Sequence, residues 1–318
     1  MLGGLLALLS AATFAVTNAA VRRGVLTGSP LQATSLSIPV GVPVFYMALL
    51  LSGNAGIFFD LPRGPLIAFA VTGVTHFVIG RYANYRAIRA IGTNLAGPVM
   101  QFNLVVSLGL AILFLGETLT PLRILGTLLI VAGPAVIRHG GSKAPAGSLK
   151  FTPKMAEGYL FAALAATCYG LSPVLLRFAG QGRGLAVSLG GGVISATSAT
   201  LVSLAVLVVP GVWRDIRRVN SHAAKWFVFS GVMVYVSQIF YYMAIALAPV
   251  TIIAPISALG NVFRIHTARW LNPEHEVFGR EVIIATTLAF LGVIVLSASV
   301  EGVPLPESWA AVLNWHWP

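Results

Sequence analysis

The stretch "AGPVMQFNLVVSLGLAILFLGETLT" (residues 96–120) is a long apolar run with Pro98 near its start and Glu117 near its end. An apolar run of about 20 residues is long enough to cross a bilayer as a helix. Comparable runs recur along most of the chain, which has 318 residues, 57% hydrophobic and only 9% charged. An ordinary soluble domain has about 25% charged residues. The sequence therefore predicts a polytopic membrane protein.

The same pattern returns in the second half of the chain. The stretch "APISALGNVFRIHTARWLNPEHE" (residues 254–276) places Pro255 and Glu274 at the same spacing, each 157 residues after its counterpart in the first stretch. Similar offsets align other spans, for example Gly133 with Gly292 at an offset of 159. The shared order of spans, with matched proline and glutamate, indicates an internal duplication.

We expect an all-α protein with ten spans, because the runs are continuous and a lipid-exposed backbone must satisfy its own hydrogen bonds. The longest connector, about residues 139–156, divides the chain into a first repeat (1–138) and a second repeat (157–299), followed by a tryptophan-rich interfacial tail (300–318). The spans are expected near residues 2–20, 32–52, 65–85, 93–115, 122–138, 157–177, 187–209, 224–246, 251–271 and 281–299.

Five spans per repeat is an odd number, so the second repeat is expected to enter the membrane in the opposite orientation. Inverted repeats are typical of secondary transporters, where the substrate site lies near the bilayer midplane between the repeats. Rocking of one repeat against the other then exposes the site to each side in turn.

The sequence resembles the EamA-type transporters of the drug/metabolite transporter superfamily. The resemblance rests on two repeats of five spans, each with a proline and a glutamate in its fourth span, and on "LFLGETLTPLRILGTLLIVAG" (residues 113–133). The second repeat departs from the pattern, since Asn272 and Pro273 stand where Leu-Gly is expected, with two extra residues. The resemblance implies a cavity lined by helices one to four and six to nine, with helices five and ten packed outside.

Charge and cysteine content narrow the class further. The net charge of +11 comes mostly from Lys and Arg between the apolar runs, where they orient a membrane protein and do not indicate nucleic-acid binding. Their distribution places both termini outside the cytoplasm by the positive-inside rule, whereas the family resemblance implies termini inside. The single cysteine, Cys168, excludes an internal disulfide. The first apolar run lacks a basic segment before it and is interpreted as a retained span rather than a signal peptide.

Ionisable residues inside the membrane are the first candidates for function. All nine acidic residues lie at span ends or in loops, which disfavours an antiporter of cationic drugs. The expected intramembrane cations are His76 and Arg81 in the third span, and Arg264 and His266 in the ninth. A buried arginine pairs well with a substrate carboxylate or phosphate, although Arg81 is close enough to a span end to snorkel. The histidines suit proton relay or a hydrogen bond to a neighbouring helix.

Neutral polar side chains mark the same helices, and each suits either a polar solute or a contact between helices. They complete the candidate substrate-binding set, and they are Asn18, Gln101, Asn103, Tyr169, Tyr235, Gln238 and Asn261. Pro98, Glu117, Pro255 and Glu274 are interpreted as structural markers.

The sequence therefore predicts an inner-membrane transporter or facilitator of a small polar metabolite, anionic or zwitterionic, such as an amino acid or organic acid. The alternatives are a broad exporter of hydrophobic drugs, a lipid-carrier flippase and a non-transporting membrane protein. No enzyme motif, metal site or cofactor is expected. The expected partners are a small-molecule substrate and the lipid bilayer, with the chain as a monomer or homodimer.

Overall fold

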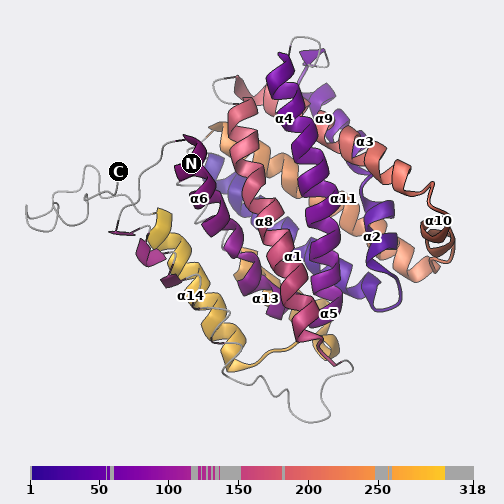
Figure 1. Cartoon of the computed structure of the whole chain (residues 1–318), viewed down its shortest axis with the longest axis vertical. Coiled ribbons are helices and arrows are strands. Elements are labelled where there is room, and N and C mark those ends of the chain that lie inside the picture. Colours follow the sequence, from indigo (N-terminus) through magenta and orange to yellow (C-terminus); the bar gives the residue numbers. More distant parts are fainter. Residues whose placement is uncertain are drawn as a thin grey trace, which may run out of the picture.

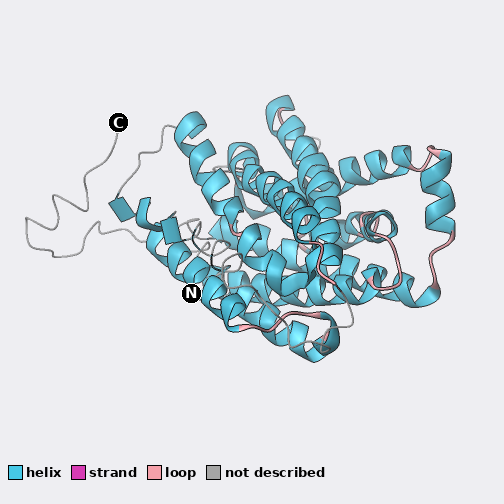
Figure 2. Ribbon diagram, turned by 60° about the horizontal axis from the view of Figure 1, so that its bottom comes forward, coloured by secondary structure: helices cyan, strands magenta, loops and turns pink. Residues whose placement is uncertain are grey.

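In the part of the chain that it describes, the computed structural model consists of helices joined by turns and loops, as Figure 2 shows. The described residues are 2–54, 56–57, 61–115, 121–122, 124–126, 128–129, 132, 136, 152–180, 183–247, 257 and 260–297. The markers Glu117 and Pro255, the tryptophan-rich tail and most of the expected fifth span lie outside these residues.

The first half of the chain follows the expected order of spans. Ser29 caps the helix that begins the second expected span, and it does so through a capping box. The Ser29 hydroxyl accepts from the Gln32 N–H, and the Gln32 side chain accepts from the Ser29 N–H. The helices are α1 (Leu2–Val25), α2 (Pro30–Ser37), α3 (Gly41–Leu51), α4 (Arg63–Thr72), the π-helix η2 (Gly73–Gly80), α5 (Arg81–Met100) and α6 (Phe102–Leu115).

The second half adds a short helix that the apolar pattern does not predict. This helix, α10, begins with a proline, and none of its residues is buried. The elements are α8 (Met155–Gly180), α9 (Gly184–Val206), α10 (Pro210–Arg217), α11 (Ser221–Leu247), α13 (Gly260–Leu271), the 3-10 turn η3 (Pro273–His275) and α14 (Arg280–Ser297).

Six helices in the described part of the chain are long and apolar enough to cross a membrane. They are Leu2–Val25, Pro30–Leu51, Arg63–Met100, Met155–Gly180, Gly184–Val206 and Ser221–Ala244. In Figure 1, α14 and α10 lie at opposite edges of the bundle. The first helix, α1, packs against α11, α13, α5 and α2, so it contacts both halves of the chain.

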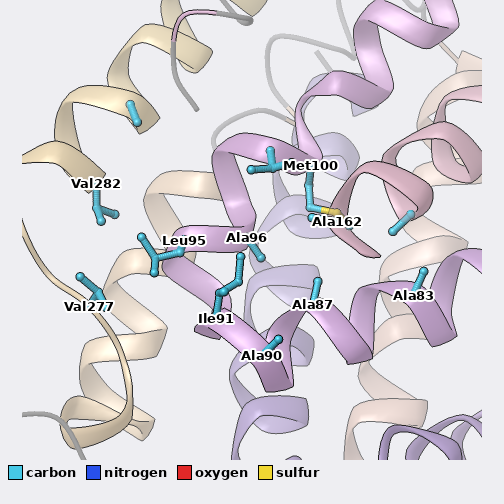
Figure 3. Close-up of a cluster of buried hydrophobic side chains, with 13 residues drawn as sticks. Ala83, Ala87, Ala90, Ile91, Leu95, Ala96, Met100, Ala162, Val277 and Val282 are labelled. Carbon is cyan, nitrogen blue, oxygen red and sulfur yellow. The ribbon is translucent and has the colours of Figure 1, made fainter. Parts of the chain in front are cut away.

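The third and fourth expected spans are joined directly instead of through a loop. The helical path runs from Arg63 to Met100 and changes direction at Gly92, which has φ 81° and ψ 171°. Figure 3 shows the chain turning between Ile91 and Leu95. The fourth span therefore begins at about residue 93, and Pro98 lies inside the helix instead of at its start. The helix is interrupted soon afterwards, at Gln101.

Small side chains let the helices approach closely, as is usual between helices in membranes. The cluster in Figure 3 joins α5 to α8 and α14 through residues such as Ala83, Ala87 and Ala162. A Cβ added at Gly73 would lie 2.2 Å from the carbonyl oxygen of Ser195 on α9. The core therefore depends on glycine and alanine at the helix contacts.

Candidate functional site

A cavity of about 200 Å³ lies between helices of both halves of the chain. Its walls come from α1, α4, η2, α5 and α6 in the first half and from α8, α11 and α13 in the second. Asp and Glu are absent from the described residues that line it. Six candidate residues from the sequence meet there, and they are His76, Gln101, Asn103, Tyr169, Gln238 and Arg264.

His76 lies in the π-helix η2, a local widening of the helix that is frequent at functional sites. Its Nδ1 is 2.9 Å from the Ser172 hydroxyl, which itself donates to the Cys168 carbonyl at 3.0 Å. The hydroxyl therefore accepts from His76, which places the ring proton on Nδ1 and leaves Nε2 without a proton in the neutral ring. The ring also stacks on Tyr169, with centroids 4.5 Å apart.

Arg264 is the arginine in the cavity wall. The residue is 91% buried, and its Nε has no hydrogen-bond partner among the described residues. The Asn103 Oδ1 and the Ser257 hydroxyl, also in the wall, are likewise buried without a described partner. Buried polar groups are normally hydrogen-bonded, so these atoms indicate a place where a polar solute or water binds.

Two other candidates, Arg81 and Tyr235, lie outside the cavity wall. Arg81 is 2% exposed and packs between the rings of Phe77 and Tyr235, at 4.9 Å and 4.6 Å from their centroids. Tyr235 donates its hydroxyl to the Ile38 carbonyl. Snorkelling does not describe Arg81, because its guanidinium is held between two aromatic rings inside the bundle.

The remaining candidates divide between the interior and the surface. Asn18 is buried and accepts a hydrogen bond from Asn84 at 3.3 Å. His266 is exposed, on the same helix as Arg264. Asn261 belongs to α13, but its side chain lies outside what the structure describes. Of the markers, Glu274 is exposed in η3.

A second polar cluster, which sequence reasoning missed, lies where α1 ends and where α5 turns at Gly92. The Glu276 carboxylate accepts from the Thr93 N–H and hydroxyl, both at 2.7 Å, and from the Asn94 N–H at 3.0 Å. It therefore caps the helix that begins after Gly92, although it lies 183 residues further along the chain. A carboxylate is favourable at a helix N-terminus.

Arg22 completes this cluster from α1. Its guanidinium donates to the carbonyls of Ile88, Arg89 and His275, and its Nε is 3.7 Å from Glu276 Oε1. Arg22 is 1% exposed and Glu276 is 1% exposed. Burial raises the pKa of the Glu276 carboxyl, while Arg22 and the Thr93 and Asn94 donors act to lower it. We call these four side chains, Arg22, Thr93, Asn94 and Glu276, the Arg22–Glu276 cluster.

The sequence does contain a signal for Glu276. The equal spacing of Pro98–Glu117 and Pro255–Glu274 obscures it, because that spacing points to Glu274 instead. Glu276 lies 159 residues after Glu117, the same offset that aligns Gly133 with Gly292. At this offset Glu276, and not Glu274, aligns with Glu117 in the sequence once the two extra residues of the second stretch are counted. Arg22 follows the first apolar run and is one of the basic residues between runs that are expected to orient the protein, but it is buried inside the bundle.

Comparison with known proteins agrees with the helical membrane architecture. The model of the EamA-like transporter family matches residues 1–138. A solved structure described as "Crystal structure of protein" covers 93% of this chain and 97% of its own, with a TM-score of 0.61 and 18% sequence identity, so the likeness concerns the fold. No curated protein matches the chain. The family match over residues 1–138 is consistent with a multi-pass membrane transporter of the EamA type, within the drug/metabolite transporter superfamily.

Proposed function

We propose that this chain is a secondary transporter or facilitator of a small polar metabolite, anionic or zwitterionic, in the cell inner membrane. The two five-helix repeats, 1–138 and 157–299, are inverted relative to each other and rock around the substrate. The cavity supports this proposal, because both repeats contribute to its wall and transporters of this kind bind substrate at the repeat interface.

The proposed substrate class rests on the charge of the cavity wall. Arg264 lies in it with an Nε that has no hydrogen-bond partner among the described residues, and acidic side chains are absent from its described lining. A guanidinium binds carboxylate or phosphate through paired hydrogen bonds. Gln101, Asn103 and Gln238 supply neutral donors and acceptors around it. A cation would find no carboxylate among these groups to balance its charge.

The size of the cavity favours a metabolite over a drug. Sites for drug-sized ligands have volumes of about 300–1,000 Å³. This cavity has about 200 Å³, and histidine, arginine, amide and hydroxyl groups lie in its wall among apolar side chains. An amino acid or a small organic acid fits this volume better than a large hydrophobic drug.

The experiment is a binding and transport screen with purified protein in liposomes. Amino acids, organic acids, amines and hydrophobic drugs are compared by ligand-dependent thermal stabilisation and by uptake of labelled solute. We expect stabilisation by an anionic or zwitterionic solute. Loss of a charge-assisted hydrogen bond costs about 1.5–3 kcal/mol, so Arg264→Gln raises the Kd by about tenfold or more, and Arg264→Lys restores part of the affinity.

Arg269→Gln is the matched control, because Arg269 is an exposed arginine on the same helix. It leaves the Kd unchanged. If Arg264→Gln and Arg269→Gln have the same affinity for every bound solute, the proposed pairing with Arg264 is wrong. If only hydrophobic drugs stabilise and cross, the drug-exporter alternative replaces the proposal.

A further inference from the structure

We propose that the Arg22–Glu276 cluster is a closed gate, and that the two repeats part there when the cavity opens toward that end of the bundle. This inference rests on the proposed function, since a gate has meaning only for a protein that moves a solute. Three observations carry it: the position of the cavity along the helices, a polar path that leads from the cavity to the cluster, and the division of the cluster between the repeats.

The cavity occupies the half of the bundle that is farther from the cluster. On α1, its wall includes Ser10, Ala11 and Phe14. Arg22 lies eight residues beyond Phe14, which is about 12 Å along a helix.

Two other helices give the same placement. The helix α11 begins at the end where α1 finishes, because the Asn220 side chain donates to the Thr27 carbonyl, and its cavity residues, 237–242, lie in its far half. The helix α8 begins beside the end of the third span, because the Lys154 N–H donates to the Ala90 carbonyl. Its cavity residues, 169–176, are again in the far half.

A polar path connects the cavity with the cluster. Asn18 lies on α1 between Phe14 and Arg22, one helical turn from each, and Asn84 donates to its side-chain oxygen. Both asparagines are less than 5% exposed. Neutral polar side chains inside a membrane join helices or contact a polar solute, and this pair lies between the cavity and Arg22. The pair therefore continues the polarity of the cavity toward Arg22.

The cluster joins the two repeats across this path. Arg22, Thr93 and Asn94 belong to the first repeat, and Glu276 belongs to the second. Further bonds cross the same boundary, from the Asn94 amide to the Val277 carbonyl and from the Asn272 amide to the Ala19 carbonyl. Movement of one repeat against the other at this end must break these contacts. The cluster therefore holds this end closed in the structure described here.

The gate is tested by the accessibility of a thiol placed behind it. The reporter is Asn18→Cys in a Cys168→Ala background, which removes the native cysteine. Sealed vesicles of both orientations are treated with a small, charged, membrane-impermeant methanethiosulfonate reagent, and the rate of modification is measured from each side. With the cluster intact, we expect slow modification from the side that carries the cluster.

Glu276→Gln weakens the cluster, because it removes the negative charge opposite Arg22 while keeping the size of the side chain. Breaking a buried ion pair is strongly unfavourable to the closed arrangement, and we expect modification from the cluster side to rise by about tenfold or more. The control is Glu157→Gln, which breaks the Arg86–Glu157 pair, an ion pair whose side chains are each 33% exposed. This control leaves the rate unchanged.

An unchanged rate in Glu276→Gln overturns the gate. If Glu276→Gln does not give a monodisperse protein, Thr93→Val is measured instead, since it removes the hydroxyl donor to Glu276 and keeps the backbone N–H. We then expect a rise of about tenfold, from the loss of one hydrogen bond to a charged group, and an unchanged rate again overturns the proposal.

The thiol measurement needs no substrate, so it separates the two proposals. A rate that rises in Glu276→Gln, in a protein that transports no anionic or zwitterionic solute, supports the opening but contradicts the proposed function. Transport of such a solute, together with an unchanged modification rate, leaves the proposed function standing and places the gate elsewhere.

Discussion

Gly92 is the residue whose replacement tests the joint between the third and fourth spans. Its backbone has φ 81° and ψ 171°, a conformation that is essentially confined to glycine. An added Cβ would also lie 2.5 Å from Oε2 of Glu276. Gly92→Ala therefore acts twice, on the backbone itself and on the carboxylate that caps the next helix.

The expected cost follows from these two effects. Holding a residue other than glycine in this backbone region costs about 1–3 kcal/mol. Displacing the carboxylate weakens at least one hydrogen bond to a charged group, worth about 1.5–3 kcal/mol. The sum is about 3–6 kcal/mol. At roughly 2 °C for each kcal/mol, the apparent Tm falls by about 6 °C or more.

The assay is thermal unfolding of the purified protein in detergent and in lipid, read by tryptophan fluorescence and by the remaining monodisperse fraction. The control is Gly109→Ala on α6, where an added Cβ meets nothing within 4 Å and φ is not positive. We expect this control to unfold at the wild-type temperature or slightly above it. Equal unfolding temperatures for the two variants would refute the assignment of strain and contact to Gly92.

Three further predictions concern other contacts. Gly73→Ala places a Cβ against the backbone of α9 and should lower the stability by about 1–3 kcal/mol, measured by the same unfolding assay; a stability equal to wild type would contradict the close approach. Glu157→Gln breaks the partly exposed pair with Arg86 and should change the stability by less than about 1 kcal/mol, and a larger loss would show that the pair is not screened by solvent. Ser172→Ala removes the acceptor for His76 Nδ1 and should weaken binding of the transported solute by about three- to tenfold; unchanged binding with unchanged unfolding would show that this hydrogen bond does not position the ring.

Much of the fold can be predicted from the sequence, because apolar runs of membrane length carry a strong signal. The expected spans near residues 2–20, 157–177, 187–209 and 224–246 each coincide with a described helix. The joint at Gly92 could not be predicted, because a glycine beside Thr93 and Asn94 also fits an ordinary loop. The π-helix at His76 has no periodicity signal, since it differs from an α-helix by less than one residue per turn.

The candidate residues fall into two groups, those that lie in the cavity wall and those that do not. His76, Gln101 and Gln238 could be proposed because polar residues in apolar runs are rare, and the structure brings them to one cavity. His266 and Arg81 are also polar residues in apolar runs, but neither lies in the cavity wall. His266 is exposed, and Arg81 is held by aromatic rings. Helix rotation and long-range packing decide these outcomes, and neither is visible in the order of residues.

The Arg22–Glu276 cluster could not be predicted, because each member looks ordinary by itself. Arg22 follows an apolar run, as an orienting charge does, and Glu276 lies in a polar connector. Their pairing depends on bringing residues 254 positions apart in the chain into contact. The burial of both side chains follows only from the approach of α1, α5 and the connector before α14.

The direct joint at Gly92 has a consequence for engineering the protein. A loop tolerates inserted sequence because its backbone is solvated and its ends are not fixed, whereas the two helices of residues 63–100 meet at Gly92 with no loop between them. An epitope tag or reporter domain inserted at Gly92 would have to separate the Ile88 carbonyl from Arg22 and the Thr93 N–H from Glu276. Topology reporters on this side of the bundle therefore belong near α10, whose side chains are not buried.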